Sequence, residues 1–346
     1  MSAGLKRLIG LAVLFVVLFL IPLRYQSLRL DAALAVIFGF AILSLVLLTG
    51  YVGQVSLCQA TFMGVAAYGT GMLTATFHLN YWVAAVAGVL MAFLLGVAVG
   101  LPALRLRGIL LAIVTLGVAL VFDKYFFRDD AFTWFTNGSE GWRIEATRIG
   151  GLVFDGREHL MPLYLVMLVV FFVVATLLVN IHNSGSGRRF RAIRDSELAA
   201  ATMGVDLTRY KLFAFGLSAA IAGIGGAFYP LLIGSVSADP FSVFYSLQFA
   251  AFAVLMGIRY VPAAALAGFF MAFTPAFIDK LNEGYRHFVP NGEIRGEWFG
   301  VVLGALLVVQ LIALPDGVWG DLRHLPERTR KLREAVAPKP RLGIAS

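Results

Sequence analysis

Residues 182–211 read HNSGSGRRFRAIRDSELAAATMGVDLTRYK, a polar stretch between two long apolar runs. Asp195 is placed to cap a short helix, Glu197 falls in its first turn, and Gly204 suits the left-handed residue that closes it. Asp206 can cap the helix that follows. A helix of about two turns is not stable alone in water, so something must hold it. The stretch is therefore predicted to contain a docking helix for a soluble partner.

The predicted docking helix combines small residues, which permit a close approach, with larger apolar ones. These are Ala199, Ala200 and Ala201, and Phe190, Ile193 and Met203. The alternative interpretation is a solvated loop, the usual nature of a charged stretch between apolar runs. Cap, small-residue face and closing glycine agree at one short helix, which favours docking.

The composition is that of a membrane protein rather than of a soluble core. Of 346 residues, 60% are hydrophobic and 14% are charged, and the mean hydropathy is +0.84. The single cysteine, Cys58, excludes an intrachain disulfide and a cysteine-built metal site. The five histidines lack metal-ligand spacing, so no metal and no cofactor is expected. The net charge of +8 gathers at the ends of apolar runs, which argues against a nucleic-acid surface.

Ten apolar stretches are predicted to cross the membrane as helices, because a span needs about 20 mainly apolar residues. They are residues 8–23, 32–48, 60–77, 83–101, 109–122, 161–181, 212–233, 243–258, 263–278 and 298–314. The first lacks a following cleavage site and is interpreted as a retained helix. The prediction is an all-α polytopic membrane protein of about ten transmembrane helices. Its transmembrane domain covers residues 1–320, and a basic tail covers 321–346.

The charged residues predict the orientation of these spans. Ten spans place both termini on one side, together with loops 102–108, 182–211 and 259–262. Lys and Arg exceed Asp and Glu on this side, whereas acidic residues are in excess on the other. By the positive-inside rule, the polar stretch and both termini are cytoplasmic.

The chain carries no energy source that its sequence reveals. No predicted span has Asp, Glu, Lys or Arg near its middle, although ion-coupled transporters and proton pumps usually bury carboxylates there. A phosphate-binding signature is also absent from the sequence. Energy for uphill movement would therefore come from another chain, bound at the docking helix. A secondary transporter or channel without ATPase subunits is the first alternative. An integral-membrane enzyme is the second, but no suitable His, Cys or acidic constellation favours it, so this chain is not expected to be an enzyme.

Uncharged hydrogen-bonding residues mark a candidate solute path. Residues 49–56, TGYVGQVS, are too polar and glycine-rich for an ordinary lipid-facing helix. Irregular backbone at membrane depth is tolerated where it is buried or lines a cavity, which predicts a re-entrant segment or a kinked helix. The candidate path residues are Gln54, Ser56, Gln59, Thr61, Thr115 and Gln248. For Thr115 and Gln248 the alternative, which is favoured, is an interhelical hydrogen bond.

Small residues four apart predict close helix packing in two places. One set is Ala67, Gly71 and Ala75, which makes packing the alternative to a path for residues 50–71. The other is Ser218, Ala222 and Gly226, where packing is favoured over binding.

Five stretches together carry a resemblance to a known family. They are GYVGQVSL (50–57), LRLRGI (104–109) with AIVTL (112–116), TNGSEG (136–141), GRRFRAIR (187–194) running on through Glu197, Ala200, Gly204 and Tyr210-Lys211, and LPDGVWG (314–320). In these stretches the chain resembles the branched-chain amino acid permease family of bacterial ABC importers, specifically the longer of its two permease subunit types.

The resemblance implies a multi-pass permease subunit in the cell's inner (cytoplasmic) membrane, which moves branched-chain amino acids or a similar small polar solute inward. It implies three kinds of partner: a second homologous permease, two cytoplasmic ATP-binding subunits that hold ATP-Mg, and an extracytoplasmic solute-binding protein. It also identifies residues 197–204 with the family's ATPase-contacting loop. The candidate contact residues are Arg194, Asp195, Glu197, Ala200 and Gly204, within a coupling loop at 182–211.

Two departures from the family pattern leave the solute open. Cys58-Gln59 stand where the family often has Gly-His, and residues 256–262 replace a glycine-rich turn. Relatives for urea and short amides exist in the wider family, so a urea or short-amide permease is the alternative within it.

Overall fold

The computed structural model describes residues 28–288, apart from 107, 145–146, 150–151, 155 and 157–159, together with residues 304–305, 308–309 and 317–320. The predicted first span, most of the predicted tenth span and the basic tail at 321–346 lie outside the described residues. The second to ninth predicted spans lie inside them, and each is a helix.

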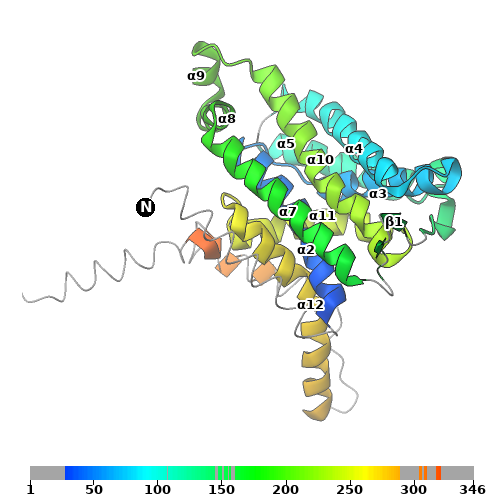
Figure 1. Ribbon diagram of the computed structural model, residues 1–346. Coiled ribbons are helices and arrows are strands. Elements are labelled where there is room, and N and C mark those ends of the chain that lie inside the picture. The colour runs from blue at the N-terminus through cyan, green and yellow to red at the C-terminus, as the bar shows by residue number, and fades with distance from the viewer. Residues whose placement is uncertain are drawn as a thin grey trace, which may run out of the picture.

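These helices make an all-α membrane protein, as predicted (Figure 1). In order they are α2 (Arg29–Leu45) continued by the π-helix η2 (Val46–Tyr51), α3 (Gln59–Phe77), α4 (Tyr81–Ala103), α5 (Ile109–Val121) continued by η3 (Phe122–Phe126), α7 (Leu160–Asn183), α10 (Leu207–Ile233), α11 (Val243–Met256) and α12 (Val261–Phe288). Among the described residues, five helical stretches are long and apolar enough to cross a membrane on their own. They are Arg29–Tyr51, Tyr81–Ala103, Ile109–Phe126, Leu160–Asn183 and Leu207–Ile233.

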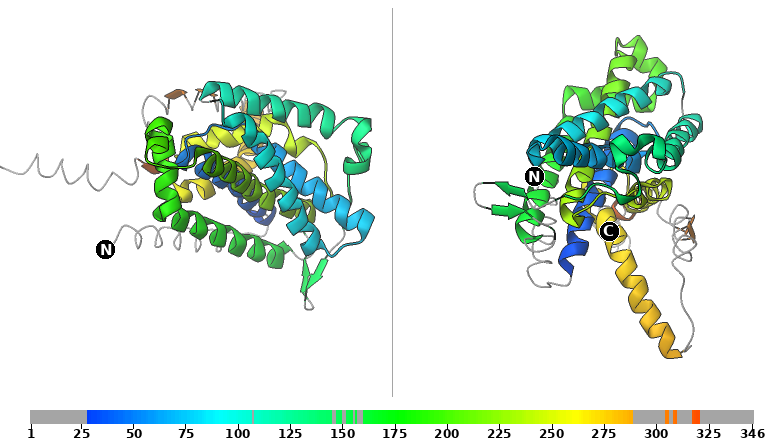
Figure 2. Two further views of the ribbon diagram at one scale, coloured as in Figure 1. Left: turned by 90° about the horizontal axis from the view of Figure 1, so that it is seen from above. Right: turned by 90° about the vertical axis from the view of Figure 1, so that its right-hand side faces the viewer.

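Two loops contain more regular structure than the sequence predicts. The stretch after α5 contains η4 (Asp130–Phe132), α6 (Thr133–Thr136), η5 (Gly138–Glu140) and an antiparallel hairpin of β1 (Thr147–Ile149) and β2 (Leu152–Phe154). The hairpin projects from the helical body (Figure 2). In addition, α12 runs to Phe288, whereas its span was predicted to end at 278. Apolar length limits a membrane span but not the helix that continues beyond it.

The centre of the fold is α2, which is apolar on all sides and buried along almost its whole length. A helix with no polar face belongs inside a bundle. Accordingly, α7, α10, α11 and α12 pack around it.

Close packing of α4, α10 and α3 depends on small residues. In α4 the buried residues include a stripe spaced by four: Ala84, Gly88, Ala92, Gly96 and Gly100. A Cβ atom on Gly96 would lie 2.4 Å from the Cβ atom of Ala219 in α10. The predicted packing of Ser218, Ala222 and Gly226 is confirmed: all three are buried, and the Ser218 hydroxyl donates to the Ser44 carbonyl at 3.0 Å. The α4 stripe has the same spacing and could have been predicted too.

The opposite face of α4 is exposed and apolar, as expected of a helix whose outer side meets lipid or another membrane subunit. Its exposed residues are Val83, Val86, Leu90 and Leu94.

Helices α8 (Gly185–Asp195) and α9 (Glu197–Thr202) lie at one end of the bundle, the polar end, and the β1–β2 hairpin lies at the opposite end, the hairpin end (Figure 1). At the polar end, Lys211 Nζ donates to the Ala103 carbonyl at 3.4 Å, so the start of α10 meets the end of α4. At the hairpin end, the Val236 amide donates to the Trp142 carbonyl at 2.9 Å. There Arg128 also bridges Asp123 at 3.1 Å and Asp239 at 2.9 Å, tying the end of α5 to the α10–α11 connection.

Two helical glycines test the packing directly. A Cβ atom on Gly226 would lie 2.0 Å from the Met63 carbonyl oxygen, whereas one on Gly117 meets nothing within 4 Å. We expect Gly226→Ala to destabilise the purified chain by about 1–3 kcal/mol, because α3 and α10 must separate. Gly117→Ala should be neutral or stabilising, by up to about 1 kcal/mol. Thermal unfolding of the chain alone in detergent measures both. Equal melting temperatures for the two variants would contradict the packing.

Candidate docking site and chain break

Two short helices, α8 (Gly185–Asp195) and α9 (Glu197–Thr202), lie between α7 and α10 where one was predicted (Figure 1). Ser184 caps α8 by accepting from the Gly187 amide at 3.4 Å. The helix buries Phe190 and Ile193, which are three residues apart and therefore share a face. The glycine-rich sequence at 182–187 suggests a loop, but the serine cap and the apolar pair were the available signals for α8.

The prediction that Asp195 caps the docking helix is wrong. Asp195 is the last residue of α8, and its carboxylate pairs with Arg194 Nε at 3.2 Å. The cap is Ser196, whose backbone is extended and whose hydroxyl accepts from the Ala199 amide at 3.2 Å. The predictions for the two later residues are confirmed. Gly204 has φ +80°, and Asp206 caps α10 by accepting from the Arg209 amide at 3.1 Å.

The outer face of α9 differs from the predicted one. Phe190 and Ile193 are buried inside this chain, as is Ala200, so they offer no surface to a partner. Met203 is 70% exposed as predicted, and Leu198, which sequence reasoning missed, is 75% exposed. Ala199 and Ala201 are exposed with them. Two large apolar side chains therefore stand out from the charged end of the bundle.

The Glu197 carboxylate contacts two other segments of this chain. Its Oε1 atom accepts from Lys211 Nζ at 2.7 Å and from Gln54 Nε2 at 3.3 Å. The side chains of Lys211 and Glu197 are only 1% and 9% exposed. Removing two charges from water is costly unless they are paired, and this pair therefore fixes α9 to α10.

Arg194 reaches the same region from α8. Its Nη1 atom donates to the Gly50 carbonyl at 3.0 Å. Its stem covers Gly53, which has φ +77° and on which a Cβ atom would lie 2.6 Å from Arg194 Cγ. Glycine is required at 53 both by the backbone conformation and by the space available.

Gly53 and Gln54 belong to a break between two helices. The chain is helical to Tyr51 and again from Gln59, and residues 52–58 are not helical. The predicted irregularity is confirmed, as a gap between separate helices rather than a kink in one. Neighbouring helices supply partners for its backbone: the Leu57 amide donates to Thr115 Oγ1 of α5 at 3.0 Å.

Most predicted path residues surround this break. The Ser56 Oγ atom lies 3.3 Å from the Cys58 Sγ atom, and the Gln59 side chain accepts from the Ser44 hydroxyl at 2.9 Å. Thr61, two residues further along the chain, is buried. Thr115, for which an interhelical hydrogen bond was the favoured alternative, instead accepts from the Leu57 amide in the non-helical break. Sequence reasoning missed Ser246 of α11, whose hydroxyl accepts from the Ala60 amide at 3.0 Å.

Gln248 lies half-buried on α11, and no hydrogen bond among the described residues ties it to the break. Solute contact by the predicted path residues stays a prediction.

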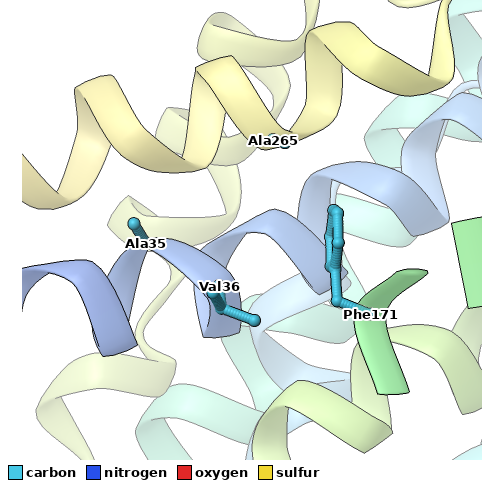
Figure 3. Close-up of a pocket in the computed structure, with 4 residues that line it drawn as sticks. All are labelled: Ala35, Val36, Phe171 and Ala265. Carbon is cyan, nitrogen blue, oxygen red and sulfur yellow. The ribbon is translucent and has the colours of Figure 1, made fainter. Parts of the chain in front are cut away.

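A small pocket lies elsewhere, between α2, α7 and α12 (Figure 3). It is lined by Ala35, Val36, Phe171 and Ala265. These side chains offer no hydrogen bond, so the pocket does not suit a polar solute.

Comparison with known proteins points to the family that the five sequence stretches resemble. Residues 31–311 match the family described as branched-chain amino acid transport system / permease component. The high-affinity branched-chain amino acid transport system permease protein LivM of Escherichia coli (strain K12) is 28% identical over 305 residues, covering 83% of this chain and 68% of the relative. LivM of Salmonella typhimurium is 27% identical over the same shares. LivH of that organism is 21% identical over 295 residues, covering 78% of this chain and 87% of the relative. No solved structure was found to match.

The corrected cap of α9 can be tested with neighbouring residues. Ser196→Ala removes the acceptor of the Ala199 amide and should cost about 1 kcal/mol of local stability. Amide hydrogen exchange in residues 197–203 should then accelerate about fivefold, whereas Asp195→Ala should leave it unchanged. Faster exchange in Asp195→Ala alone would restore Asp195 as the cap.

Proposed function

Since the chain belongs to the branched-chain amino acid transport system permease family, we propose that it is the membrane-spanning subunit of an importer for these amino acids, driven by ATPase subunits that bind at α8 and α9. The family match over most of the chain carries the permease assignment. The exposed Leu198 and Met203 support the place of docking.

The polar end of the bundle is the cytoplasmic end in this proposal. Arg188 and Arg189 are exposed on α8, the helix that precedes α9. An excess of Lys and Arg favours the cytoplasmic side. A cytoplasmic partner with an apolar groove and an acidic rim would fit both features.

A second permease is the proposed membrane partner. The chain is similar to LivM and also, more weakly, to LivH, and both are named as permease proteins of high-affinity branched-chain amino acid transport systems. Two related permeases enclosing one path would place the solute between subunits. An extracytoplasmic binding protein would deliver the solute at the hairpin end.

Uptake measurements test which solute the importer carries. The chain is expressed with its partner subunits and binding protein in cells that lack branched-chain amino acid uptake. We expect saturable leucine uptake that isoleucine and valine inhibit, that excess urea leaves unchanged, and that stops when ATP is depleted. Uptake that survives ATP depletion would instead indicate a secondary transporter or channel. Urea uptake without leucine uptake would indicate an amide permease.

Charged substitutions on the exposed side of α9 test the docking surface. Leu198→Asp and Met203→Asp should each reduce the ATPase that co-purifies with the permease about tenfold or more, because a buried apolar contact is replaced by an unpaired carboxylate. Leu79→Asp is the matched control, since Leu79 is a partly exposed leucine in the loop between α3 and α4, at the hairpin end. Full ATPase recovery with both α9 variants would exclude α9 as the docking surface.

A further inference from the structure

We propose that α8, α9 and the break at residues 52–58 form one mechanical unit, in which Glu197, Arg194 and Gln54 act as positioning residues that transmit motion of the docking helices to the break. The proposal rests on the proposed function only in taking α9 as the site where an ATPase pushes. The contacts that carry it lie within this chain.

The first connection is the group of Glu197, Lys211 and Gln54. One carboxylate oxygen of Glu197 receives both the Lys211 ammonium at 2.7 Å and the Gln54 amide at 3.3 Å. Gln54 is 5% exposed, and its Oε1 atom is buried without a hydrogen-bond partner. The contact to Glu197 therefore satisfies the Gln54 amide nitrogen, and breaking it would leave a buried donor unpaired. Movement of Glu197 is thus resisted unless Gln54 moves with it.

The second connection is made by Arg194, one helix earlier. A charged guanidinium donating to the Gly50 carbonyl is a stronger hydrogen bond than one between neutral groups. Because the Arg194 stem also packs directly on Gly53, the arginine holds the break both by a hydrogen bond and by contact. The two connections come from different helices and meet the chain within residues 50–54.

The break is well placed to pass motion on. Downstream of it, Leu57 is bonded to α5 through Thr115, and Ala60 is bonded to α11 through Ser246. Upstream, a Cβ atom on Gly50 would lie 2.2 Å from the Ile258 carbonyl oxygen in the α11–α12 turn. Residues 50–60 therefore contact α5, α11 and the α11–α12 turn, in addition to α8 and α9.

The contacts around the break extend to residues 314–320, the last of the five stretches that carry the family resemblance. Gly257 in the α11–α12 turn has φ +111°, and Gly317 has φ +79°. A Cβ atom on Gly317 would lie 2.5 Å from the Gly257 Cα atom. Two family-like stretches, at 50–57 and 314–320, thus contact this turn, and Arg194 of a third, at 187–194, contacts Gly50 and Gly53 of the first.

A simpler alternative is that α9 acts through α10 alone. Asp206 joins α9 to α10 directly, and Lys211 belongs to α10. In that case the hydrogen bond between Gln54 and Glu197 serves only to stabilise the fold. Its loss would not change the amount of solute moved per ATP hydrolysed.

The first test uses the assembled transporter in vesicles. Gln54→Met keeps the length of the side chain and removes its hydrogen bond. We expect the variant to retain ATPase binding, while solute moved per ATP falls about fivefold. Because Gln54 is also a predicted path residue, the hydrogen-exchange measurement below separates a lost solute contact from a lost connection. Thr74→Val is the control, since it removes a hydrogen bond within α3 that is remote from the break. A structural defect would lower hydrolysis and uptake together. An unchanged ratio of solute to ATP would overturn the proposal.

A double variant shows whether the residues act through one contact. Glu197→Gln combined with Gln54→Met should reduce the ratio no further than the more severe of the two single variants. Full additivity of the two effects would contradict a shared connection.

Amide hydrogen exchange on the purified permease, with no ATPase present, tests whether α9 and the break are connected. Glu197→Gln should accelerate exchange in α9 and in residues 52–58 by similar factors, since both lose the same anchor. Acceleration confined to α9 would overturn the proposed unit. If no ATPase binds the wild-type chain, the proposed function fails, and this measurement still tests the connection.

Discussion

The buried ion pair between Lys211 and Glu197 is the constraint on which the polar end of the bundle depends. Neither charge is exposed enough to be stabilised by water, so each requires the other. Lys211 lies in the first turns of a long membrane helix, and Glu197 begins a helix of six residues. The pair therefore holds α9, which is too short to be stable alone, in a fixed position against α10. Without it, α9 could neither present Leu198 and Met203 nor transmit a force.

Small residues supply the complementary constraint within the bundle. The stripe on α4 and the glycines of α10 bring backbones close enough that a methyl group cannot be added. Such packing is suited to a membrane, where apolar side chains gain little by leaving lipid and close backbone contact provides much of the attraction. A rigid bundle of this kind leaves the non-helical segment at 52–58 as a natural place for movement. The glycine at 53 and the short polar side chains around it fit that role.

The sequence predicts the helical architecture well, because a 20-residue apolar run has few alternatives in a membrane. It also predicts Gly204 and Asp206, whose local conformations depend on their own chemistry. Asp195 and Ser196 were ambiguous, since both residue types cap helices, and the choice was decided by the pairing of Asp195 with Arg194. The inward orientation of Glu197 could not be predicted: its partner Gln54 lies 143 positions away in the chain. Contacts of that separation leave no periodic signal.

The most direct test of the account is a pair of experimental structures of the assembled transporter, one with and one without bound nucleotide. We predict that the distances from Glu197 to Gln54 and from Arg194 to the Gly50 carbonyl stay the same in both states. Residues 52–58 should be displaced between the two states together with α8 and α9. If α8 and α9 move while residues 52–58 stay where they are in the bundle, the central claim is contradicted.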